Sequence, residues 1–147
     1  MAAEPYVTQL RIEAPPEIVF DCFCDPNALL TWMGDRADLD PKPGGKFEVD
    51  VNGAPARGEF MVLDRPRRLV FSWGFAGSDE LPPGASTVEV TLVPDGPATQ
   101  LTLVHSGLPE SQTEPHAVGW THFLERLAIA ASGGDPGPDP WASNPSQ

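Results

Sequence analysis

The stretch "PHAVGWTHFLERLAIAA", residues 115–131, decides the fold because it is the longest amphipathic segment of the chain. Its apolar residues recur at positions i, i+3, i+4, i+7 and i+11, a spacing that places them along one face of an α-helix. They are Trp120, Phe123, Leu124, Leu127 and Ala131. A helix with such a face needs an apolar partner surface, which the rest of the chain must supply.

One residue of this helix conflicts with helical propensity. Gly119 stands directly before Trp120, although a glycine inside a helix costs about 1 kcal/mol relative to alanine. Because glycine has no Cβ, we expect the helix backbone to approach a neighbouring strand or short helix closely here, with Trp120 directed into the sheet. The alternative is that Gly119 faces solvent.

The partner surface is predicted to be an antiparallel β-sheet. Alternating apolar and polar residues indicate strands, and "NGAP", "DRP" and "DGPA" between them are typical of hairpin turns. The six predicted strands cover residues 6–13, 46–51, 56–64, 67–75, 86–94 and 99–107. A sheet of this size is expected to curl around the terminal helix.

Two short helices are predicted after the first strand. "APPEIVFDCFC" has prolines in its first turn, and in "DPNALLTWM" Asp25 can cap the helix that Pro26 begins. "DLDPKPGG", residues 38–45, is predicted to be a loop. The fold class is therefore α+β, in a single domain over residues 1–131. Residues 132–147, rich in Pro, Gly and Ser, are expected to form a disordered tail.

Charge and composition exclude several classes of protein. The chain has 21 acidic and 9 basic residues, a net charge of −12, so it repels nucleic acids and anionic membrane surfaces. The sequence has no signal-peptide pattern and no apolar run of about 20 residues, which favours a cytoplasmic location. Cys22 and Cys24 diverge on a helix and cannot bridge each other, and we expect them to be structural or incidental thiols.

The histidines are the candidates for polar chemistry. His105 shares a strand face with apolar residues, and His116 lies one turn before Trp120, at the mouth of any cavity. Either one can be a hydrogen-bonded structural histidine or the anchor of a ligand. His116 and His122 face different ways, and Ser106 points away from His105, so neither a metal site nor a nucleophile is predicted. No catalytic residue and no cofactor are expected.

Inward-facing apolar residues of the sheet and the helix predict a cavity between the two. Such a cavity suits a small apolar ligand, unless the same side chains fill the space as core. The candidate lining residues are Trp32, Phe47, Phe60, Phe71, Trp73, Leu103, His105, His116, Trp120, Phe123 and Leu124.

The order of these segments resembles that of a known family. The chain is similar to the activator of heat-shock-protein-90 ATPase homologue-like domains of the START/SRPBCC superfamily, which includes the birch allergens. The likeness covers residues 7–131 and depends on "IEAPPEIVFDCFCDPNALLTWMG", "PGGKFEVDV", "RGEF", "RPRRLVFSW", "TQLTLVHSGLP" and "GWTHFLERL" together. It implies the helix-grip fold, with a cavity that takes apolar small molecules in relatives.

Three functions are open at this point. The first is a module that binds a small apolar or aromatic molecule without turnover. The second, implied by the family name, is a protein that contacts a chaperone and modulates its ATPase activity. The third is an enzyme like the polyketide cyclases, in which His105 and His116 would move protons. We expect a monomer or a homodimer, and binding without catalysis is favoured.

Overall fold

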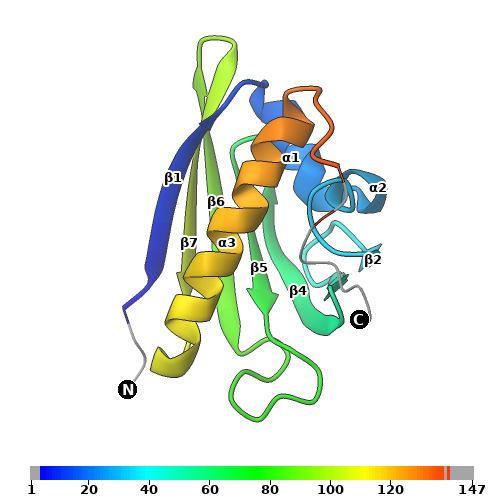
Figure 1. Cartoon of the computed structure of the whole chain (residues 1–147), viewed down its shortest axis with the longest axis vertical. Helices are drawn as coiled ribbons and strands as arrows, with labels where there is room; N and C mark the ends of the chain where they lie inside the picture. Colours follow the sequence, from blue (N-terminus) through cyan, green and yellow to red (C-terminus); the bar gives the residue numbers. More distant parts are fainter. Residues whose placement is uncertain (1–3, 138, 140–147) are drawn as a thin grey trace.

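The computed structural model describes residues 4–137 and 139, and in them α3 crosses one face of a curved antiparallel sheet (Figure 1). The order of elements along the chain is β1 (Tyr6–Ile12), α1 (Pro16–Cys24), α2 (Pro26–Leu29), β2 (Arg36–Leu39), β3 (Lys46–Val51), β4 (Ala54–Asp64), β5 (Arg68–Trp73), β6 (Ser86–Asp95), β7 (Ala98–Ser106) and α3 (Glu110–Ala131). The strands lie side by side as β1-β7-β6-β5-β4-β3-β2. The predicted fold class, a helix-grip α+β fold, is confirmed.

The sheet has seven strands where six were predicted. The additional strand, β2, pairs antiparallel with β3, with Arg36 opposite Asp50 and Leu39 opposite Phe47. Its first residues precede the predicted loop, and its last two fall inside it. The strand has only four residues and lies at the edge of the sheet. Pairing with β3 therefore determines its conformation more than its own sequence does.

Helix α3 begins at Glu110, five residues before the predicted start. Pro115, the first residue of the predicted segment, lies inside the helix. A residue outside the helix stabilises its first turn. Glu80, in the loop between β5 and β6, accepts hydrogen bonds from Ser111 Oγ at 2.6 Å and Gln112 Nε2 at 2.7 Å. These bonds anchor the loop to the start of α3.

The hairpin between β3 and β4 is one of the predicted turns and is confirmed. Asn52 and Gly53 have φ angles of 54° and 93°, the left-handed conformation that a two-residue type I′ turn requires. Val51 and Ala54 therefore face each other across the turn.

The deep part of the space between sheet and helix is filled by aromatic side chains. Phe47 stacks on Phe71 with ring centroids 4.1 Å apart, and Phe60 meets Phe47 edge-on at 5.4 Å. On the other side of the core, Trp32 contacts Phe23 and donates its indole N–H to the carbonyl of Cys22 at 3.0 Å. The five aromatic side chains are fully buried.

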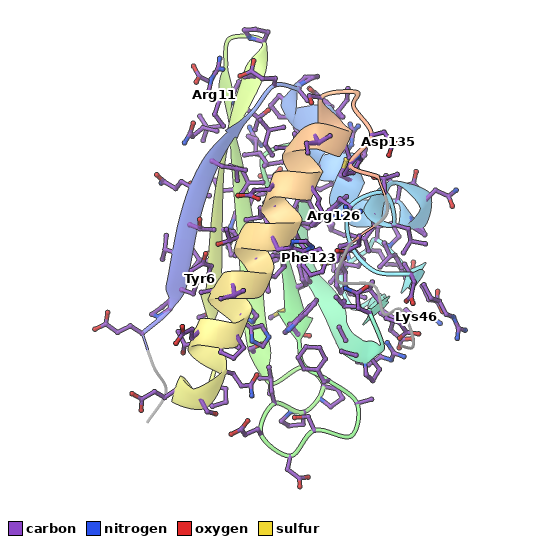
Figure 2. All side chains as sticks on the ribbon, viewed as in Figure 1. Tyr6, Arg11, Lys46, Phe123, Arg126 and Asp135 are labelled. Carbon is purple, nitrogen blue, oxygen red and sulfur yellow. The ribbon has the colours of Figure 1, made fainter. Side chains whose placement is uncertain are left out.

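The segment after α3 packs against side chains of the helix. Arg126 of α3, labelled in Figure 2, donates from Nη2 to the carbonyl of Gly137 at 3.0 Å and from Nε to the carbonyl of Trp32 at 3.2 Å. Asp139 lies 2.7 Å from Nε2 of His122 and accepts a hydrogen bond from Asn52 at 3.1 Å. Of the tail predicted to be disordered, residues 132–147, positions 138 and 140–147 lie outside the described residues.

None of the described helices is long and apolar enough to cross a membrane.

Candidate functional site

A cavity of about 230 Å³ opens between the first half of α3 and the sheet. Its floor comes from the end of β5 and from the β3–β4 hairpin, and α3 forms its opposite wall. The wall is almost entirely apolar. The lining residues are Met33, Val51, Ala54, Trp73, Phe75, Gln112, Pro115, His116, Gly119, Trp120 and Phe123.

Four of the predicted lining residues border this cavity. They are Trp73, His116, Trp120 and Phe123. The other candidates, which pack in the core instead of on the cavity wall, are Trp32, Phe47, Phe60, Phe71, Leu103, His105 and Leu124. All seven are buried, although strand alternation left the side of Phe60 open and gave no position for Trp32. A pattern of this kind does not show how far along α3 each side chain lies, and the cavity borders the helix only from Gln112 to Phe123.

The remaining wall residues were not predicted to line the cavity. Val51 and Ala54 flank the β3–β4 turn, and Phe75 follows β5, where the strand alternation ends. Gln112 and Pro115 belong to the first turns of α3, which were not assigned to the helix's inner face. The "NG" turn signal shows where the hairpin ends and could have identified Val51 and Ala54 as rim residues.

Gly119 also lines the cavity, and the prediction of close backbone packing there is wrong. Apart from the two neighbouring residues and the helix's own backbone, no atom lies within 4 Å of the point that a Cβ would occupy. The alternative, that Gly119 faces solvent, does not describe it fully either, because Gly119 is half-buried. The glycine therefore leaves open space between α3 and the sheet instead of bringing the two together.

A chain of hydrogen bonds runs beneath the cavity wall. The indole N–H of Trp120 donates to Nδ1 of His105 at 3.0 Å. The hydroxyl of Ser86 donates to the carbonyl of Trp73 at 2.7 Å, so Ser86 Oγ accepts from Nε2 of His105, which lies 2.8 Å away. His105 is thus a neutral imidazole with its proton on Nε2.

The chain continues through the second indole to His116. The N–H of Trp73 donates to Nε2 of His116 at 3.1 Å. Nδ1 of His116 lies 2.9 Å from the carbonyl of Gln112, which can only accept. His116 is therefore neutral as well, with its proton on Nδ1, the opposite tautomer to that of His105.

Burial keeps both imidazoles neutral. Burial, together with the neighbouring His116, lowers the pKa of His105 to about 3. Burial also lowers the pKa of His116, although the hydrogen bond to Gln112 opposes the change. The two rings lie 5.1 Å apart, edge to face, so a charge on either would be poorly solvated and close to the other. The two histidines accept hydrogen bonds from Trp73 and Trp120 and so fix the orientation of both indoles in the cavity wall.

The other candidate groups are not poised for chemistry. Cys22 and Cys24 are free and buried, and burial raises the pKa of the first thiol to about 11 and of the second to about 12. Both are therefore protonated at neutral pH and poor nucleophiles. Among residues 4–137 and 139, no three His, Cys, Asp or Glu side chains converge to hold a metal ion.

The chain is similar to a known protein family and to several solved structures. The sequence profile described as activator of Hsp90 ATPase homolog 1-like protein matches residues 13–132. The solution NMR structure of an AHSA1-like protein from Rhizobium etli is 42% identical, covers 98% of this chain and 92% of its own, and superposes with a TM-score of 0.72. No match to the chain occurs among curated proteins.

Two further solved structures are similar over most of the chain. CalU16 from Micromonospora echinospora is 30% identical, with 88% of this chain and 76% of that one covered and a TM-score of 0.70. An Hsp90 activator from Plasmodium falciparum is 25% identical, with 86% and 95% covered and a TM-score of 0.72.

Proposed function

The chain belongs to the family of activator of Hsp90 ATPase homolog 1-like proteins, and from this premise we propose that it binds a small apolar molecule in the cavity under α3. The observation that carries the proposal is the cavity itself, about 230 Å³ bounded by Trp73, Phe75, Trp120 and Phe123. Concave, mostly apolar sites with few polar groups are the usual form of a small-molecule site.

Binding without turnover is the favoured form of this proposal. A general acid or base must reach the substrate with a nitrogen or oxygen that is free to exchange a proton. Both ring nitrogens of His105 and of His116 already have protein partners. These residues were the two candidates for a cyclase-like enzyme, and their engagement in the network argues against that role.

A thermal-shift screen with apolar and aromatic compounds tests the proposal. A compound present at about 100 times its dissociation constant adds roughly 2.7 kcal/mol to the free energy of unfolding. For a chain of this length that raises the unfolding midpoint by roughly 5–10 °C. Native mass spectrometry of freshly purified protein should also detect any molecule that co-purifies in the cavity.

Two variants make the screen specific to the cavity. Ala54→Leu adds bulk to the cavity wall from the sheet side and should reduce the shift. Val93→Leu changes a side chain on β6 that is 53% exposed and does not line the cavity, and its shift should equal that of the original protein. If no compound of a broad panel raises the unfolding midpoint, the proposal is refuted.

A chaperone partner is the second candidate function, and the similarity to the Hsp90 activator from Plasmodium falciparum is the observation in its favour. This candidate requires that the chain changes the rate of ATP hydrolysis by a purified Hsp90. An unchanged rate at saturating concentration would exclude it, whatever the outcome of the ligand screen.

A further inference from the structure

We propose that Gly119 determines which ligand the cavity takes, and that this ligand is a flat, uncharged molecule of about two fused aromatic rings lying against the backbone of α3. The inference rests on the proposed function and adds to it the size, shape and polarity of the ligand. Three separate features of the cavity support it.

The first feature is the volume. A dry apolar cavity of about 150 Å³ accommodates one benzene molecule. The cavity under α3 is larger, at about 230 Å³, so it has room for a second fused ring.

The second feature is the arrangement of aromatic rings. Trp73 meets Trp120 at 5.8 Å between ring centroids and Phe75 at 5.6 Å, and the ring planes are tilted by 46° and 77°. Phe123 extends the same wall along α3. Aromatic pairs favour offset-stacked and edge-to-face contacts, and rings at these angles offer both to a flat guest.

The third feature is the polarity of the wall. The indole N–H groups of Trp73 and Trp120 both donate to histidines, and both nitrogens of His116 are engaged. Gln112 directs its amide N–H to Glu80. A charged or strongly polar guest would lose its hydration without gaining these groups as partners. An uncharged aromatic molecule has no such loss.

Gly119 is the residue of α3 that leaves room for such a molecule beside the helix backbone. A glycine at this position weakens α3, and no neighbour uses the missing Cβ for close packing. A side chain here would project into the cavity, because Gly119 is part of its wall. The glycine thus gives up helix stability and leaves room beside the backbone of α3, where the face of a flat molecule can lie.

The experiment measures the dissociation constant of naphthalene by tryptophan fluorescence for the full chain and three variants. Gly119→Ala should raise the unfolding midpoint by roughly 2–4 °C and weaken naphthalene several-fold. Gly119→Leu should weaken naphthalene by roughly tenfold or more. Val118→Leu, on the neighbouring residue that is 52% exposed, should bind as the original chain does. The charged analogue 2-naphthoate should bind at least roughly tenfold more weakly than naphthalene.

The outcomes separate this inference from the proposed function. If Gly119→Leu and Gly119→Ala bind naphthalene as tightly as the original chain, the role of Gly119 is refuted. Equal affinity for 2-naphthoate and naphthalene would refute the predicted polarity. If other apolar compounds raise the unfolding midpoint and naphthalene does not bind, the inference fails while the proposed function stands. If no compound binds, both fail.

Discussion

Replacing Phe47 with alanine is expected to lower the free energy of unfolding by about 3–5 kcal/mol. Phe47 is fully buried, stacks on Phe71 at 4.1 Å and contacts Phe60 and Trp73. Its removal leaves a closed void among side chains that cannot collapse freely. Because domains are stable by about 5–15 kcal/mol in total, this one substitution removes a large share of the stability.

Chemical denaturation measures the effect, and Phe75→Ala is the matched control. Phe75 has ring contacts with Trp73 at 5.6 Å and with His116 at 5.9 Å, but it is only partly buried and borders the cavity. Its removal widens a space that already exists, so the cost should be clearly smaller. Equal costs for the two variants would contradict the assignment of Phe47 to the closed core and of Phe75 to the cavity wall.

Acidification from pH 7 to pH 5 is expected to lower the free energy of unfolding by about 2 kcal/mol through His105 alone. In the unfolded chain a histidine takes up a proton below a pKa of about 6.5, whereas in the folded chain the pKa of His105 is lowered to about 3. The unfolded state therefore binds more protons throughout this window, and stability falls with pH. The lowered pKa of His116 acts in the same direction.

Imidazole nitrogen resonances in NMR spectra make this prediction specific to the two residues. At pH 5.5 His105 should remain neutral with its proton on Nε2, and His116 should carry its proton on Nδ1 at pH 7. A protonated His105 at pH 5.5, or a free energy of unfolding that stays constant between pH 7 and pH 5, would contradict the hydrogen-bond assignment.

The sequence predicts most of the fold because its local signals agree with one another. The alternation in "KFEVDV" gives β3 its bounds, "NG" gives the turn after it, and the apolar stripe of α3 identifies the helix that the sheet grips. Elements whose local signal is weak were missed or misplaced. They are β2, four residues long and dependent on β3, and the first turn of α3, which Glu80 holds from a distant loop.

The site was predictable only in part, for two physical reasons. Periodicity shows that a side chain faces inward but not whether it lies in the filled or the open part of the grip, and for this reason Phe47 and Phe71 were grouped with Trp73. The partners of the histidines depend on register between separate elements. Ser86 meets His105 because β6 pairs with β7, and Trp120 reaches His105 from α3.

Gly119 shows both what the sequence can indicate about the site and what it leaves open. A glycine in the middle of an amphipathic helix was a correct sign that something unusual occurs there. Its meaning, close packing or an open space, depends on atoms from other elements, and the structure shows open space.

The most direct test of a ligand site under α3 is a titration of naphthalene into ¹⁵N-labelled protein, followed through the indole N–H resonances. Trp73 and Trp120 border the cavity, whereas Trp32 is fully buried in the core and donates a hydrogen bond to the carbonyl of Cys22. The resonances of Trp73 and Trp120 should shift and saturate while that of Trp32 stays in place. No saturable shift at either cavity tryptophan, or an equal shift at all three, would contradict a binding site under α3.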